Sequence, residues 1–557
     1  MKTTPEGGSR ANERGSVLAL ALAFSAIVGS LIVASITVAM LQSRSVEFAV
    51  NSTGALSMAE GITELAKKQM LQELADFKEP STAGNFNLGG RSHPWTAAPI
   101  GPAIYRTDPD GVTVVVTPYE ISASVQEETG FATVNQVVDL TLTPLFQFMI
   151  FFDDDLEILP GPNMQLEGRV HANGNIYVGA GNTLTVDTDY FRSTGTIQRN
   201  RKNDGAATGG TVDIRKFGTT DFTQMTNTMD SDNADWTQLA LDTWGGTVQD
   251  GSHGITEIVA PNMGTITQGG YYHENAELVI VDGLAFDTNG NQLPMPAGVI
   301  KETTMYDARE GTNITVTEVD MELLNSSGFF PTNGLVYAYR TDTTSSQPNG
   351  IRLTNGAELA APLSVVSEDP VYVHGDYNTV DKKGAAIICD AINLLSNAWD
   401  NSKGPGQLPG ASQTTYNFAM ITGNVRTPDG GGAYSGGFEN LPRFHENWSG
   451  VAAKIRGAFA NLYGSQFADS AWSYGGDRYT APLRDWRYDP DLLDPNNLPP
   501  FTPNAVNVRR VLWDDNLPIQ FQVDTSGMTF PGDTAIYDPW SYDPTFMDSV
   551  MNDPNGN

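Results

Sequence analysis

The fold of this chain is decided near its start by residues 16–41, which read SVLALALAFSAIVGSLIVASITVAML. No charged side chain interrupts this run. At about 1.5 Å of rise per residue, a helix of about 25 residues is roughly 37 Å long, whereas the hydrocarbon core of a bilayer is about 30 Å thick. The run therefore predicts one membrane-spanning helix.

The residues that flank the run favour a span that stays with the mature protein. Lys2, Arg10 and Arg14 precede it and favour a cytoplasmic N-terminus, although Arg44 directly after the run weakens the asymmetry of charge. A secretory signal has a shorter apolar core and a following small-residue cleavage site, which residues 41–44 do not offer. We therefore expect a single anchor, with the bulk of the chain in the periplasm or at the cell surface.

The apolar pattern continues beyond Arg44 with a helical period. Residues 46–75 contain no proline. Their apolar positions recur at intervals of three and four residues, as on one face of a helix: Leu56, Ala59, Ile62, Leu65, Ala66, Met70 and Leu74. The residue before a proline resists the α conformation, so we expect the helix to reach about Phe77 and to stop before Pro80. The prediction is one membrane and stalk helix over residues 16–78.

Composition limits the rest of the chain of 557 residues. Gly (56) and Pro (32) are plentiful and only 17% of the residues are charged, which favours a folded, turn-rich, mainly β protein over a disordered one. The formal net charge of −33 would repel phosphates, so we expect no nucleic-acid partner. The single cysteine, Cys389, excludes an intramolecular disulfide and a multi-cysteine metal site.

The predicted fold class is mainly β with a long N-terminal α-helix. Short β-branched runs such as Val112–Val116 and Val134–Leu142 predict an antiparallel meander. Later runs broken by Gly and Asn suit either a β-solenoid or a sandwich, with short helices at residues 236–244 and 385–395. The expected parts are a leader (1–15), the helix (16–78), a linker (79–110), the meander (111–158), a solenoid-like β-rich domain (159–400), its Gly- and aromatic-rich C-terminal part (401–523) and an acidic tail (524–557).

The N-terminal residues resemble a known family. A basic leader ending in Glu13-Arg14-Gly15, an apolar helix directly after the glycine, and the small-residue stretch 55–62 are similar to type IV pilin-like proteins, most nearly to the PilX N-terminal class of minor pilins. The resemblance covers residues 1–78 and implies cleavage by a prepilin peptidase between Gly15 and Ser16. Major pilins carry a glutamate at the fifth mature position, where this chain has Leu20. That departure argues against a repeating filament subunit.

The densest cluster of polar side chains lies near the C-terminal end of the β-rich part. Glu439, Arg443, His445 and Glu446 could form an acid/base set, because paired carboxylates can hydrolyse glycosides. Arg443 is four residues from Glu439 and three from Glu446, however, which are the spacings of ion pairs on a short helix. We therefore interpret Glu439, Arg443 and Glu446 as a structural ion-pair cluster and expect no catalytic residues.

Two acidic runs raise the question of a metal. Residues 230–235 alternate carboxylates as calcium loops do, and residues 153–155 are three aspartates. The first run lacks the glycine and glutamate of an EF-hand loop, whose positions hold Asp235 and Leu241. No cofactor is expected, and calcium is the only metal that the sequence suggests.

These observations lead to one hypothesis with two rivals. The chain is expected to be a non-enzymatic, pilin-like envelope protein, anchored in the inner membrane through residues 16–41 and packed through its N-terminal helix against other pilin-like subunits. It would act in assembly, tip display or adhesion of a type IV pilus or a related filament. The first rival is a membrane-anchored carbohydrate-active β-solenoid enzyme, which needs two carboxylates about 5–10 Å apart in a groove. The second is a signal-anchored surface module that keeps residues 1–15.

Overall fold

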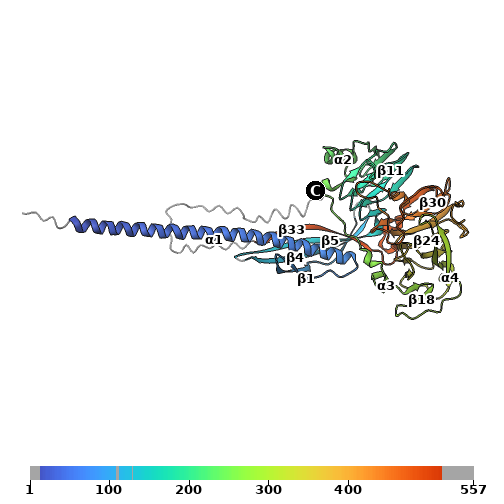
Figure 1. The fold of residues 1–557 in the computed structure, drawn as a ribbon, viewed down its shortest axis with the longest axis horizontal. Coiled ribbons are helices and arrows are strands. Elements are labelled where there is room, and N and C mark those ends of the chain that lie inside the picture. Colours follow the sequence, from blue (N-terminus) through green and yellow to red (C-terminus); the bar gives the residue numbers. More distant parts are fainter. Residues whose placement is uncertain (1–12, 108–111, 128, 517–557) are drawn as a thin grey trace, which may run out of the picture. The chain divides into compact units, whose positions relative to one another are not determined.

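A computed structural model of the chain describes residues 13–107, 112–127 and 129–516. Most of the predicted leader (1–12) and the predicted acidic tail (524–557) lie outside the described residues. The described chain is a long N-terminal helix followed by a large β-rich part with few short helices, which confirms the predicted fold class (Figure 1).

The N-terminal helix, α1 (Glu13–Ala75), is continuous. It ends two residues before the predicted end at Phe77, which adopts a left-handed φ of 61°. The amide of Phe77 donates to the carbonyl of Leu74 (3.2 Å) and the amide of Lys78 to that of Glu73 (2.7 Å). This pair of bonds is a Schellman motif, so a backbone turn ends the helix before Pro80 is reached.

Six antiparallel strands form a sheet against α1, in the order β1-β2-β4-β5-β33 with β3 on the edge of β4 (Figure 1). They are β1 (Ala83–Leu88), β2 (Arg91–Pro99), β3 (Ile104–Thr107), β4 (Thr113–Glu127), β5 (Gly130–Pro144) and β33 (Asn504–Asn516). Three of these strands lie in residues 79–110, which differs from the predicted linker. Gly89 and Gly90 have positive φ in the β1–β2 turn, so these glycines mark a hairpin and not a flexible segment.

The chain then winds into a solenoid whose coils stack in parallel on three faces, with antiparallel hairpins at residues 211–224, 278–286 and 300–320. Leu156, Ile176 and Ile197 are register partners at spacings of 20 and 21 residues, so each coil has about that length. The first face contains β6 (Ile150–Phe152), β9 (Val170–Ala172), β12 (Phe191–Ser193) and β16 (Val248–Gln249). The second contains β7 (Leu156–Ile158), β10 (Ile176–Val178) and β13 (Ile197–Gln198), and the third β8 (Met164–Glu167), β11 (Thr183–Asp187), β14 (Thr211–Arg215) and β15 (Phe222–Gln224).

A second half of the solenoid follows after residue 277 and continues the same faces. Its first face contains β17 (Leu278–Val281), β18 (Leu284–Phe286), β21 (Leu335–Tyr339), β23 (Leu363–Val366), β25 (Ala385–Cys389), β28 (Ala419–Thr422) and β31 (Phe459–Asn461). Its second face contains β19 (Ile300–Asp307), β20 (Thr312–Asp320), β22 (Gly350–Thr354), β24 (Val371–His374), β26 (Ile392–Leu395) and β29 (Arg443–Phe444). The third contains β27 (Thr414–Asn417), β30 (Ala452–Gly457) and β32 (Leu483–Tyr488).

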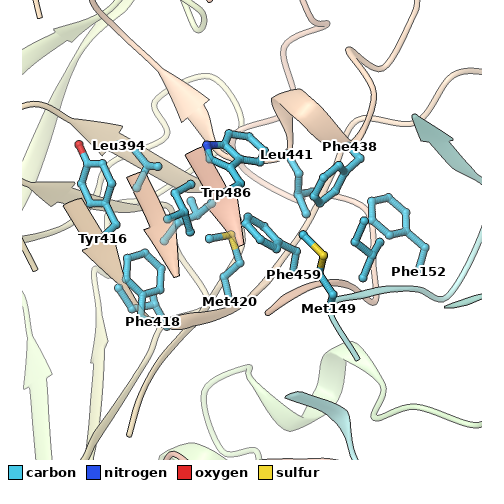
Figure 2. Close-up of a cluster of buried hydrophobic side chains, with 14 of the residues drawn as sticks. Met149, Phe152, Leu394, Tyr416, Phe418, Met420, Phe438, Leu441, Phe459 and Trp486 are labelled. Carbon is cyan, nitrogen blue, oxygen red and sulfur yellow. The ribbon is translucent and has the colours of Figure 1, made fainter. Parts of the chain in front are cut away.

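The two halves meet at one strand pair, where β31 lies parallel to β6 and completes an 11-stranded sheet. The order in that sheet is β16-β12-β9-β6-β31-β28-β25-β23-β21-β17-β18, so the first and last coils along the chain are neighbours in the middle. Phe459 of β31 packs in the same buried cluster as Met149 and Met420 (Figure 2). The choice between solenoid and sandwich, which the sequence left open, is thus settled as a solenoid.

The solenoid is an insertion within the sheet that covers α1. Strand β5 ends at Pro144 and β33 begins at Asn504, and these two residues are register partners. The predicted meander over 111–158 therefore ends earlier, because β6 and β7 already belong to the solenoid. The last part of the predicted C-terminal region, residues 504–516, returns to the sheet at α1.

Short helices decorate the solenoid. They are α2 (Trp236–Trp244), α3 (Tyr271–Asn275), α4 (Met321–Ser326), and the 3-10 turns η1 (Leu145–Gln147), η2 (Gly251–His253), η3 (Met263–Thr265), η4 (Phe438–Asn440), η5 (Pro490–Leu493) and η6 (Pro495–Asn497). Helix α2 was predicted, together with its stop at Gly245 in the left-handed conformation. The prediction of a helix over residues 385–395 is wrong, because β25 and β26 occupy this segment. A continuous apolar run buried on both faces fits a parallel strand as well as a helix.

Candidate membrane-anchoring and subunit-contact helix

Helix α1 is divided into two parts by what covers it. From Leu22 to Val50 its large apolar side chains face solvent, with Leu22 63% and Phe24 67% exposed. The exposed set is Leu22, Phe24, Ile27, Val28, Leu31, Ile32, Val33, Ile36, Val38, Met40, Leu41, Val46 and Val50. A contiguous apolar surface of this kind marks a contact with lipid or with another protein. Among the described residues, α1 is the one helix long and apolar enough to cross a membrane.

The second part of α1 packs on the antiparallel sheet. Ala55, Ala59, Ile62, Ala66 and Met70 are fully buried there. All but Ala55 are positions of the predicted apolar face, whereas Leu65, which was predicted on that face, is 39% exposed. Their partners are apolar side chains of the sheet, namely Trp95, Ala97, Ile121, Ala123, Val125, Ala132, Val134, Val138, Leu140 and Val506. The sheet therefore holds the stalk half of α1 as the core of a small α+β unit.

The boundary between the two parts lies where the β4–β5 hairpin meets the helix. The side-chain amide of Asn51 donates to Thr129 Oγ1 at 3.0 Å. A Cβ on Gly130 would lie 2.3 Å from the carbonyl carbon of Asn51, so only glycine allows this approach. Beyond this point the described sheet no longer covers α1, and the apolar side chains of residues 22–50 are left open.

The exposed part is suited to an environment without water. Ser30 Oγ donates to the carbonyl of Ile27 at 2.8 Å, and Thr37 Oγ1 donates to that of Val33 at 2.9 Å. These hydroxyl groups are satisfied inside the helix, which removes the cost of placing them in hydrocarbon. A Cβ on Gly29 would meet no atom within 4 Å, so this position offers a smooth patch for close approach of another helix.

The C-terminal end of α1 is fixed to the solenoid. Asp76 accepts hydrogen bonds from the backbone amide of Asn262 (3.0 Å) and from its side chain (2.6 Å). The ring of Phe77 stacks on Tyr271, with centroids 4.0 Å apart. The segment that carries Asn262 and Tyr271 also forms an antiparallel bridge between Val259 and Val506 of β33. The helix is thus joined to the solenoid by side-chain contacts as well as by the chain.

The predicted processing point lies within α1. Gly15 and Ser16 are in its first turns, which begin at Glu13. Nothing in the described geometry bears on cleavage, so the Gly15–Ser16 site stays a prediction.

The ion-pair cluster predicted from Glu439, Arg443 and Glu446 is corrected by the structure. Glu439 lies in η4 and Arg443 in β29, so helical spacing does not apply. Arg443 Nη1 lies 2.6 Å from Glu310 Oε1, and both side chains are buried. Glu446 accepts from the amide (2.7 Å) and hydroxyl (2.6 Å) of Ser396 instead. Arg443 therefore neutralises a carboxylate far away in the sequence, which spacing alone could not reveal.

Among the described residues Glu439 forms no ion pair, and its carboxylate accepts a hydrogen bond from the amide of Leu159 at 3.2 Å. Burial raises its pKa to about 7, against the attraction of Arg484. Glu157 approaches from β7, and burial raises its pKa as well. The cavity beside Glu157 has a volume of only about 10 Å³, room for one water molecule and not for a sugar ring. This site gives no support to glycoside hydrolysis.

The remaining polar candidates also have structural roles. Burial lowers the pKa of His445 to about 4, and its Nε2 lies 2.9 Å from Asn393 Oδ1. Asp230 accepts from the amide of Arg199 at 3.1 Å, and Asp235 occupies the N-cap position of α2, although its side chain makes no capping hydrogen bond. Burial raises the pKa of Asp153 to about 6. Within the described ranges no group of three or more His, Cys, Asp or Glu side chains could hold a metal ion, so calcium gains no support.

Comparisons with known proteins add little. No family model matches the chain, and no curated protein sequence matches it. One solved structure that is similar is the competence-associated pilin ComZ from Thermus thermophilus, at 10% sequence identity and a TM-score of 0.22, covering 84% of this chain and 98% of that one. Values this low assign neither a family nor a function.

Proposed function

We propose that this chain is a membrane-anchored, pilin-like subunit with no enzymatic activity, in which α1 is the anchor and the solenoid is the displayed domain. The observation that carries this proposal is the division of α1 at Asn51. A helix that was only a signal or a plain anchor would not need a second half buried under its own sheet. A pilin-like subunit needs both halves of the helix. The buried half is held by the sheet of the folded domain, and the exposed half lies first in lipid and then against other helices.

The assembly step follows from the surface of residues 22–50. In the membrane, lipid tails cover the apolar side chains. In a filament, equivalent helices would replace the lipid, and close packing at small residues such as Gly29 would hold them together. The exchange needs no cofactor and no covalent chemistry at this helix.

A minor position, at the tip of a type IV pilus or of a related filament, fits the insertion best. Every subunit of a repeating lattice would carry residues 145–503 as an extra domain, and a lattice has little room for that. The sequence departure at Leu20 points the same way. Assembly, tip display and adhesion are the roles that such a position offers.

Mass spectrometry of the mature N-terminus tests the proposal. In cells with an active prepilin peptidase we expect the chain to begin at Ser16, and in cells without it to keep residues 1–15. Retention of residues 1–15 in both would favour the plain signal-anchored module.

Contact between helices can be tested with thiol crosslinking. Cys389 is fully buried and burial raises the pKa of its thiol, so this thiol should not react with crosslinkers in the folded protein. A single Val38→Cys variant should crosslink to cysteines placed at the same depth in partner subunits. Leu483→Cys, an exposed position on β32, is the matched control and should not.

A further inference from the structure

An open cleft lies at the end of the 11-stranded sheet that is formed by β17 and β18. Its volume is about 760 Å³. Its apolar lining, referred to here as its floor, is made by Val279, Val281, Leu284, Phe286 and Tyr339, and its other lining residues come from the α3 region and from the turn after β18. We refer to it as the β17–β18 cleft.

The floor is the continuation of a face that is covered elsewhere. Along the same sheet, Phe151 of β6 and Tyr337 of β21 are buried in a cluster that includes Ile266 and Tyr272. That layer stops short of β18, where Leu284 is 49% exposed. The side chains of Val281 and Phe286 are likewise only partly buried. The apolar face of the sheet is therefore left uncovered at β17 and β18, and an exposed apolar surface of this kind is suited to binding another molecule.

The charged side chains around this floor are all acidic. Glu274, Asp282 and Asp287 line the cleft, and no Lys or Arg is among the described residues that line it. Asp282 accepts from the amide of Thr341 at 2.9 Å, and Asp287 accepts from that of Asn291 at 2.8 Å. These bonds fix the two carboxylates in place. The nearest arginine along the chain, Arg340, is held by other carboxylates, Glu302 and Asp342, each at 2.8 Å.

We propose that the β17–β18 cleft docks an extended peptide segment of another protein in which cationic and aliphatic side chains alternate. The aliphatic side chains would cover Val281 and Leu284, and the cations would meet Glu274, Asp282 and Asp287 at the rim. This arrangement complements both the shape of the floor and the sign of the charge around it.

Other occupants fit less well. Residues 517–557 of this chain contain no Lys or Arg, and a second copy brings a net charge of −33, so both would be repelled. A glycan is usually held by an open aromatic ring, whereas Tyr339 is only 6% exposed and Phe286 is partly buried, so neither of these rings is fully open. The docking needs neither the anchor nor a filament, so its test is independent of the proposed function.

The test measures fluorescence anisotropy of a labelled octapeptide that alternates Arg and Val, titrated with the full-length protein in nonionic detergent. Saturable binding is expected, and it should be lost when Glu replaces Arg and weakened when Ser replaces Val. Glu274→Lys and Leu284→Gln alter exposed side chains, one at the rim and one on the floor. Each should weaken binding about tenfold, which corresponds to about 1.4 kcal/mol.

The matched controls are Asp242→Lys and Leu241→Gln on α2, which packs at β16, the opposite end of the same sheet. Leu241 is also exposed. These variants should bind as the parent does. Equal weakening by the α2 variants would mean attraction to acidic surface in general and would overturn the proposal. Absence of peptide binding would also overturn the proposal. So would binding of a glycan from a test panel, if Glu274→Lys and Leu284→Gln abolished that binding.

Discussion

Phe459 lies beside Ile150 in adjacent parallel strands, although Phe459 belongs to the last strand of the 11-stranded sheet along the chain and Ile150 to the first. This pair closes the solenoid, because the other two faces have no strand ladder across the same point among the described residues. On those faces contacts without a ladder join the halves: β7 contacts η4, β8 contacts β32, and Arg487 of β32 pairs with Glu167 of β8. Among the described residues, the β6–β31 pair is the place where a strand ladder crosses, so its buried side chains should contribute strongly to the stability of both halves.

Phe459→Ala tests that dependence. The side chain is fully buried between the two halves, so the truncation should lower the free energy of unfolding by about 3–5 kcal/mol. Urea denaturation followed by tryptophan fluorescence would measure it. The exposed Phe217→Ala should cost far less, and equal losses in the two variants would contradict a special role for the junction.

Gly130→Ala tests the contact that divides α1. The added Cβ would collide with the backbone of Asn51, so we expect a loss of about 1–3 kcal/mol and faster proteolysis of the sheet. Gly61→Ala is the matched control inside α1, where a Cβ meets no atom within 4 Å. It should stabilise the protein by up to about 1 kcal/mol, because alanine is the better helix former. We therefore expect the melting temperature to fall in Gly130→Ala and to rise in Gly61→Ala.

Arg443→Met tests the buried pair with Glu310. It leaves an uncompensated carboxylate in the core and should cost about 3–5 kcal/mol. The double variant Arg443→Met with Glu310→Met should recover most of that loss, because neither charge remains. A double variant that is no more stable than Arg443→Met would show that Arg443 acts mainly through other partners, such as the carbonyl of Ala468.

The raised pKa of Glu439 should make the stability of the protein depend on pH. Burial raises its pKa from 4.5 to about 7, so the folded protein holds this proton more tightly than the unfolded chain does. Folding therefore takes up a proton between these values, and the free energy of unfolding should fall by on the order of 3 kcal/mol as the pH rises through them. Denaturation at several pH values would measure this slope.

Glu439→Gln should flatten that slope, because the amide stays neutral at every pH. Glu277→Gln is the control: hydrogen bonds from Asn333 and Thr332 lower the pKa of Glu277, so its titration lies below this range. A slope that persists in Glu439→Gln would assign the effect to other buried carboxyl groups, such as Glu157.

Ile32→Arg tests the anchor. An arginine in the middle of a membrane span costs about 2.5–3.5 kcal/mol, so a larger fraction of the variant than of the parent should be released from membranes by a carbonate wash, while the rest of the fold melts as in the parent. Ile104→Arg, at an equally exposed position on β3, should stay in the membrane. Membrane retention of Ile32→Arg equal to that of the parent would contradict the assignment of residues 22–50.

The sequence allowed prediction of features that are local in the chain. Apolar spacing located α1 to within a few residues at its C-terminal end, and the glycine after Trp244 located the end of α2. Residues 385–395 were misassigned because a strand buried on both faces has no period of its own. The segment before β4 was taken as a linker because its glycines and prolines mask the alternation of Trp95 and Ala97.

The polar sites depended on contacts between distant parts of the chain. Glu310 lies in the turn between β19 and β20 and meets Arg443 of β29, although β19 and β29 are at opposite ends of the same sheet, and no spacing along the chain encodes that contact. The β17–β18 cleft is likewise built from residues between Gln268 and Tyr339 that belong to separate elements. The fold class could therefore be predicted from periodicity. The sites could not, because they form only when distant parts of the chain come together in the folded solenoid.

The pairing of Pro144 with Asn504 has a consequence for how such a chain can change. Register partners on adjacent strands are about 5 Å apart, so residues 145–503 leave and re-enter the sheet as a hairpin loop would. The stalk depends on one further segment of the insertion, residues 259–271, which contacts Asp76, Phe77 and Val506. Coils outside that segment could be added or lost without shifting the register of the stalk sheet, so the displayed domain and its carrier can evolve at different rates.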